Sequence, residues 1–210
     1  QSAQAHLDSL TKPPGSLGVL EELAKKYSAI RDTHHPCIKK KSVIVFAADH
    51  GVTQEGISAY PAEVTAQMVL NFLNGGAAIN VLARQQNADI LVVDIGVNHR
   101  FNAHPHLLDR KVAFGTRNMA QETAMTRTQA EESITIGIQI AAQLADTGVD
   151  LLATGEMGIG NTTASSAIFS VLGNLSVAEV TGRGTGIDDK TLTKKIAVIQ
   201  QALEKHSPDP

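Results

Sequence analysis

Three short runs of apolar residues constrain the fold of this chain more than any other feature of its sequence. They lie in the expected strands 43–48, 90–95 and 150–154, the last with only Leu151, Leu152 and Ala153 apolar, and each strand is followed by a turn that contains glycine. A continuous apolar run of this length is typical of a strand buried on both faces of a parallel sheet. Because helical patterns separate the runs, the sequence predicts a doubly wound α/β fold, with a Rossmann-like parallel sheet flanked by helices.

Apolar periodicity and end signals place the expected helices. Ser16 is a candidate cap for a first helix over 16–30, which follows a rigid turn. Thr128 and Glu131 form a capping-box pair at the start of a longer helix that ends near residue 146. The other expected helices cover 61–72, 77–86, 161–172 and 189–205, while residues 97–126 give a mixed pattern.

Composition narrows the class of function. With 42% hydrophobic and only 3% aromatic residues, the 210-residue chain must build its core from aliphatic side chains. A net charge of −3 gives no basic field for a polyanion, so nucleic acid is not an expected partner. The single Cys37 excludes an internal disulfide framework and a multi-cysteine zinc site. No apolar run approaches a membrane span and no secretory signal is visible, so a cytoplasmic location is expected.

Polar residues follow the expected strands at points that should meet in space. Asp49-His50-Gly51, Asp94-Ile95-Gly96 and Gly155-Glu156 each come at the carboxyl end of an apolar run. In doubly wound sheets the ligand lies beyond these ends, so the three loops are predicted to face one crevice.

The richest loop is the glycine-rich stretch 155–163. Its glycines let backbone N–H groups approach a ligand, and Asn161, Thr162 and Thr163 add polar side chains at a helix start. This pattern favours a phosphate monoester. It nearly matches the P-loop motif, but Asn161 occupies the lysine position, which argues against an NTPase. The alternative is that the glycines only permit tight packing of strand against helix.

Other candidate groups are less specific. A second glycine cluster at 181–186 precedes a helix with Lys194 and Lys195, which would either neutralise a phosphate or lie on a solvated face. Glu156 is a carboxylate in an otherwise neutral glycine-lined turn, placed to accept a proton or to orient a heterocycle N–H. His99, His104 and His106 share a loop, where solvation is favoured over zinc binding.

Five motifs in order resemble the nicotinate-nucleotide–dimethylbenzimidazole phosphoribosyltransferase family, over nearly the whole chain. They are TKPPGSLG at 11–18, ADHGV at 48–52, YPAEVT at 60–65, GTRNM at 115–119 and GEMGIGNTT at 155–163. The resemblance implies a Rossmann-like core over residues 36–210, a smaller helical part over 1–35, and a homodimer. It implies transfer of phosphoribose from nicotinate mononucleotide to 5,6-dimethylbenzimidazole, giving nicotinate and α-ribazole phosphate, with no metal or other cofactor.

The same resemblance assigns residues to the site. Glu156, Met157 and Gly158 would line the pocket of the bases, with Glu156 in a supporting catalytic role. Tyr60, Gln67 and Met68 would border the benzimidazole. The residues implied around the ribose phosphate are Asn161, Thr162, Thr163, Gly184 and Lys195.

One departure from the family concerns length. Family members are longer, and their general base is a glutamate in a carboxyl-terminal glycine-rich segment that nothing in this chain matches. We therefore expect the chain to represent part of the family enzyme. The alternatives are an inactive truncated form and a non-catalytic nucleotide- or base-binding module.

Overall fold

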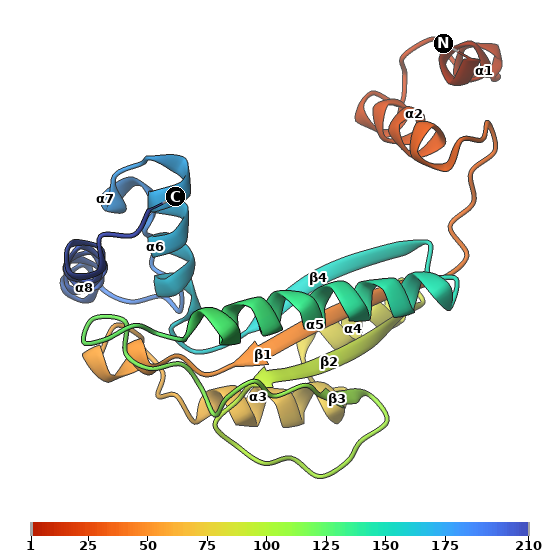
Figure 1. Cartoon of the computed structure of the whole chain (residues 1–210). Helices are drawn as coiled ribbons and strands as arrows, with labels where there is room; N and C mark the ends of the chain where they lie inside the picture. Colours follow the sequence, from red (N-terminus) through yellow and green to blue (C-terminus); the bar gives the residue numbers. More distant parts are fainter. Residues whose placement is uncertain (1, 210) are drawn as a thin grey trace. The chain divides into compact units, whose positions relative to one another are not determined.

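The computed structural model describes residues 2–209, so Gln1 and Pro210, the outer limits of the expected domains, lie outside the described residues. The chain divides into two compact units, Gln1–Lys39 and Lys40–Pro210. Figure 1 shows the helices and strands in sequence colours. The boundary between the units, at 39/40, lies four residues beyond the expected one at 35/36.

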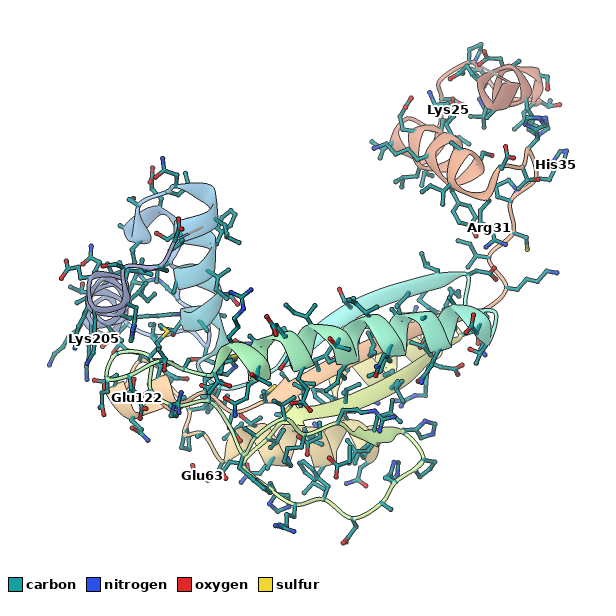
Figure 2. The ribbon with its side chains drawn as sticks, viewed as in Figure 1. Lys25, Arg31, His35, Glu63, Glu122 and Lys205 are labelled. Carbon is teal, nitrogen blue, oxygen red and sulfur yellow. The ribbon has the colours of Figure 1, made fainter. Side chains whose placement is uncertain are left out.

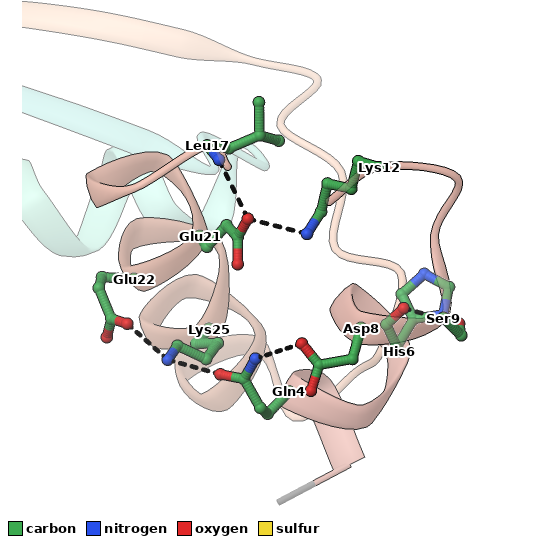
Figure 3. A network of polar contacts seen from close by, with 9 residues as sticks. All are labelled: Gln4, His6, Asp8, Ser9, Lys12, Leu17, Glu21, Glu22 and Lys25. Carbon is green, nitrogen blue, oxygen red and sulfur yellow. Dashed lines mark hydrogen bonds and ion pairs between the residues drawn. The ribbon is translucent and has the colours of Figure 1, made fainter. Parts of the chain in front are cut away.

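The first unit is a pair of helices, α1 (Ser2–Ser9) and α2 (Val19–Arg31). Figure 3 shows the polar contacts that join the two helices and the turn between them. Glu21 forms an ion pair with Lys12 Nζ at 2.8 Å and accepts a hydrogen bond from the Leu17 backbone N–H at 3.2 Å, and the contact with Lys12 lowers the pKa of Glu21. Ser16 does not cap α2 as expected: its N–H donates to the Pro13 carbonyl, and Gly18 is the residue at the helix start.

The second unit is built on a parallel sheet, which confirms the predicted fold class. Its strands, in the order β3-β2-β1-β4, are β1 (Lys41–Ala48), β2 (Ala88–Gly96), β3 (Leu107–Asp109) and β4 (Leu151–Met157). Strand β1 pairs with β2 from Lys41↔Ala88 and with β4 from Lys41↔Leu151. Strands β2 and β3 therefore lie on one side of β1 and β4 lies on its other side, which is the Rossmann arrangement.

Helices cover both faces of this sheet (Figure 1). On one face the core contains Val45, Val92 and Val69 of α3 (Val64–Leu73), followed along the chain by α4 (Ala78–Gln85). On the other face Ile44 and Val93 pack against α5 (Arg127–Asp146). Because successive side chains of a strand point to opposite faces, the apolar runs supply both cores.

The remaining elements lie beyond the carboxyl ends of the strands. They are the 3-10 helix η1 (Gly51–Glu55) and the helices α6 (Asn161–Gly173), α7 (Val177–Val180) and α8 (Asp189–His206). Ala167, Val177 and Ile199 pack together, one from each of these three α-helices. Val198 of α8 also packs against Val52 of η1, so α8 is fixed beside the loop that follows β1.

Three local expectations are corrected. Gly155 and Glu156 belong to β4, where they pair with Val45 and Phe46, because the strand extends past the apolar run. Thr126 with Gln129, and not Thr128 with Glu131, forms the capping box of α5. The mixed region contains the short strand β3, whose three residues give too little pattern to detect.

Candidate active site

The sheet reverses its strand order between β1 and β4, and a cavity opens at their carboxyl ends. In this fold class that position is where ligands bind. The cavity, called here the apolar cavity, has a volume of about 500 Å³. Its lining includes Phe46, Ala48, His50, Met119, Met125, Glu156, Met157, Asn161 and Ile168.

Among the described residues, Glu156 is the only acidic side chain on the wall of the apolar cavity. It projects from the exposed edge strand, yet its partial burial among apolar neighbours raises the pKa of its carboxyl. A carboxyl with a raised pKa is suited to holding or taking up a proton near neutral pH. Met157 lines the same cavity and also packs against the sheet core.

A turn of three residues, Gly158 to Gly160, joins β4 to α6. A Cβ at Gly158 would lie 2.3 Å from the Ala48 carbonyl oxygen and 3.0 Å from His50 Nε2, so the turn crosses directly over β1's end. Gly160 has a φ of 86° and is the residue before the first turn of α6. The glycines thus permit the close packing of strand against helix that the sequence suggested, and they place the backbone of the turn on the wall of a pocket at the start of α6.

A small pocket of about 120 Å³ lies against this helix start and is called here the anion pocket. Its lining is Ile57, Ser58, Gly158, Gly160, Asn161, Thr162, Thr163, Arg183, Gly184, Thr185 and Lys195. Both glycine-rich segments of the sequence therefore meet at one pocket. All five residues that the resemblance implied around a phosphate are among its walls.

Lys195 reaches the anion pocket from α8 with only 2% of its surface exposed. Its Nζ donates to Thr162 Oγ1 at 2.7 Å and to the Gly182 carbonyl at 3.1 Å. Among residues 2–209 no carboxylate forms an ion pair with it, and burial lowers the pKa of its ammonium. Its neighbour Lys194 is exposed and lies on a solvated helix face. Of the two lysines, only Lys195 lines the pocket.

Two further features concern the walls of the anion pocket, one its polarity and one the space around Lys195. Thr163 is fully buried, and its Oγ1 has no hydrogen-bond partner among the described residues. Gly184 has a φ of 53°, and a Cβ there would lie 3.0 Å from Thr162 Oγ1 and 3.4 Å from Lys195 Nζ. Any side chain at position 184 would therefore crowd the ammonium group.

A third cavity, called here the polar cavity, has a volume of about 500 Å³ and lies between η1, α3 and the loop after β2. Gln67 lines it, whereas the adjacent Met68 packs against the sheet core. Glu63, labelled in Figure 2, lines it at the start of α3. Tyr60 lies in the preceding loop with 55% of its surface exposed. The assignment of Tyr60, Gln67 and Met68 to a benzimidazole stays a prediction.

His50 separates the apolar cavity from the polar cavity, since its side chain belongs to both linings. Burial lowers its pKa from 6.5, and the charge of Asp49 opposes this shift only in part. In the folded chain His50 is therefore neutral at pH values where an unfolded histidine is already protonated.

This difference predicts a pH dependence of stability. Above pH 6.5 the neutral His50 contributes fully, and its contribution falls as the pH drops below 6.5 towards the lower pKa of the folded state. We expect His50→Gln to reduce the decline of the melting temperature between about pH 7.5 and about pH 5.5. Parallel melting curves in buffers of constant ionic strength measure this. Equal declines in both proteins would contradict the assignment.

Sequence reasoning missed some of the residues that shape the site. Thr65 and Arg183 received no role, although Thr65 ends the motif at 60–65 and Arg183 lies in the second glycine cluster. His50 was noted, but its place between two cavities depends on the packing of β4 against β1. The three histidines of the 97–106 region form no metal site: the described residues contain no group of three or more metal-binding side chains. None of the described helices has the length and apolarity needed to cross a membrane.

A parallel sheet of this order, with a glycine turn at the switch point beside a buried lysine, defines a Rossmann-like protein with a small polar pocket at the carboxyl ends of its strands. A family model described as "Phosphoribosyltransferase" matches residues 1–210. The chain belongs to the nicotinate-nucleotide–dimethylbenzimidazole phosphoribosyltransferase family.

Curated relatives and solved structures agree with this membership. The chain is 57% identical over 209 residues to the nicotinate-nucleotide–dimethylbenzimidazole phosphoribosyltransferase of Chloroflexus aggregans, covering 100% of this chain and 59% of the relative. The protein of that name from Geobacter metallireducens is 56% identical over 208 residues, at 99% and 59% coverage. The crystal structure of CobT from Thermus thermophilus superposes with a TM-score of 0.93 at 46% identity, covering 98% of this chain and 62% of that one. The chain thus spans about six-tenths of the length of these relatives.

Proposed function

We propose that this chain carries the phosphate-side half of a phosphoribosyltransferase site, which moves phosphoribose from nicotinate mononucleotide to 5,6-dimethylbenzimidazole or a related base. The observation that carries the proposal is the buried Lys195 ammonium, which has no carboxylate partner among residues 2–209. A buried cation is costly unless it is paired, so its pocket is suited to a ligand anion.

The phosphate monoester would occupy the anion pocket. There Lys195 and the Thr162 hydroxyl provide donors, and the positive end of helix α6 favours negative charge. Asn161 lines both the anion pocket and the apolar cavity, so a ribose between the two cavities would lie beside it. Binding of the remote phosphate would hold the reacting carbon in place.

The base pocket would be lined by Glu156, Met157 and Gly158, of which Glu156 and Met157 line the apolar cavity. Tyr60, Gln67 and Met68 would border the benzimidazole from the side of the polar cavity, which Gln67 lines. In the reaction the bond from the anomeric carbon to nicotinate breaks and its electron pair leaves with nicotinate. A bond to the benzimidazole nitrogen forms, and the N–H proton of that base must pass to a carboxylate. Glu156 has a supporting role here, since its raised pKa suits proton transfer.

The proposal also covers the size of the acceptor base, the location of the protein and its oligomeric state. A Tyr60 side chain near the acceptor base would restrict the size of that base. We propose that the protein acts in the cytoplasm as a homodimer and contributes to the lower ligand of cobamides. No metal and no other cofactor enters the proposed reaction.

The first test is binding. We expect nicotinate mononucleotide to bind at least about tenfold more tightly than nicotinate riboside, which lacks the phosphate, because charge-assisted hydrogen bonds to a phosphate are strong. Isothermal titration calorimetry with the two ligands measures this ratio. Equal affinities would contradict the proposed phosphate site.

The second measurement separates an enzyme from a binding module. Nicotinate release is followed after both substrates are mixed with the chain and, in parallel, with a relative of full length. Release by the full-length protein, together with tight binding by this chain, supports the proposed reaction. Tight binding without release by either protein would favour a binding module.

A further inference from the structure

Thr65 lies on α3 and touches the glycine turn from outside the site. Its side chain is fully buried, and its Oγ1 accepts a hydrogen bond from the Ile159 backbone N–H at 3.0 Å. Ile159 is itself only 5% exposed. Water therefore cannot replace this acceptor easily, and the N–H of Ile159 depends on Thr65 for its partner.

Ile159 stands between Gly158 and Gly160, which have no side chains to anchor the turn. The other backbone bonds at this point are local: the Asn161 N–H donates to the Gly158 carbonyl at 3.1 Å, and the Thr163 N–H donates to the Gly160 carbonyl at 3.0 Å. These bonds shape the turn but do not fix it relative to the sheet. The Thr65 hydrogen bond joins it to a residue 94 positions away, on a helix that packs against the sheet core.

The same helix faces a second cavity. Glu63, just before α3, and Gln67 within it line the polar cavity, while Thr65 contacts the turn that begins the anion pocket. A shift of the turn relative to α3 would therefore change the spacing between these two cavities.

We infer that Thr65 is a positioning residue for the phosphate: through Ile159 it holds the glycine turn, and with it the start of α6, where they line the anion pocket. This inference rests on the proposed function of the anion pocket. It assigns no contact between Thr65 and any ligand. Its effect should therefore appear in the part of the affinity that comes from the phosphate, and not in the part that comes from the base and ribose.

The test compares the same two ligands, nicotinate mononucleotide and nicotinate riboside, in variants of the whole chain. Thr65→Val keeps the shape of the side chain but removes the acceptor. We expect the ratio of the two affinities to fall by roughly tenfold in Thr65→Val, since a buried N–H without a partner favours displacement of the turn. Thr65→Ser restores the oxygen and should bring the ratio back to within about twofold of the original.

Ser170→Ala is the matched control. Ser170 is 7% exposed on α6, and its hydroxyl donates to the Leu175 carbonyl at 2.7 Å at the far end of that helix. This variant also loses one buried hydrogen bond, yet its affinity ratio should be unchanged. If the ratio in Thr65→Val equals that of the unmodified chain, Thr65 has only a structural role and the inference is wrong. If the unmodified chain itself does not distinguish the ligands, the proposed phosphate site fails first and this inference fails with it.

Discussion

Lys195→Met is expected to weaken the binding of nicotinate mononucleotide by about 100-fold while leaving the ligand-free chain as stable as before, or more so. The loss of affinity follows from the charge: hydrogen bonds from an ammonium to a phosphate contribute about 1.5–3 kcal/mol each. The gain in stability follows from burial. Lys195 is 2% exposed and forms no ion pair with a described carboxylate, so an apolar side chain of similar length removes a desolvation cost.

Titration calorimetry and urea denaturation measure the two effects separately. Lys194→Met provides the control, because Lys194 is the exposed neighbour on the same helix. Lys194→Met removes the same formal charge from the chain, but it should change neither the affinity for nicotinate mononucleotide nor the free energy of unfolding appreciably. Equal losses of affinity in the two variants would indicate a general electrostatic effect, and the assignment of the anion pocket to Lys195 would then be wrong.

Gly158→Ala should have the largest effect on stability, a loss of about 3 kcal/mol or more in the free energy of unfolding. The added methyl group would lie 2.3 Å from the Ala48 carbonyl oxygen and 3.0 Å from His50 Nε2. Ala48 is the last residue of the central strand, so its carbonyl cannot move without disturbing the pairing of β1. The midpoint of a urea unfolding curve measures the loss.

Gly137→Ala is the control for Gly158→Ala, because position 137 has room for the added methyl group. Gly137 lies within α5, and a Cβ there would meet nothing within 4 Å. Alanine is a better helix former than glycine by about 1 kcal/mol, so this variant should be slightly stabilised. A similar loss of stability in both variants would show that the close approach of β4's turn to β1 does not account for the effect at Gly158.

Most of the fold could be predicted from the sequence because its signals are local. The strands β1 and β2 are continuous apolar runs, and helices such as α6 and α8 begin near the expected residues. Element ends were less certain. The start of α5 was misplaced because Thr126 and Thr128 both precede residues able to complete a capping box, and only the backbone conformation distinguishes them.

The site was predictable in parts but not as a whole. The two glycine clusters could each be connected with a phosphate, yet only the family resemblance, and no local pattern, places 158–163 beside 183–185 and Lys195. Of the two adjacent lysines, the choice of Lys195 over Lys194 depends on how α8 rotates against α6. Thr65 and His50 act through contacts with residues about 100 positions away, and single-sequence patterns carry no information about such pairs.

The pairing of β1 with β4 also affects how the chain reaches its native state. The partners Lys41 and Leu151 are separated by about 110 residues, so their contact closes one of the longest loops in the molecule. Closing a long loop costs chain entropy before any contact offsets it, and such pairings slow folding. The glycine turn and Glu156 both depend on this strand. The ability to hold a ligand therefore requires this long-range pairing, because the first three strands alone lack the glycine turn and the anion pocket.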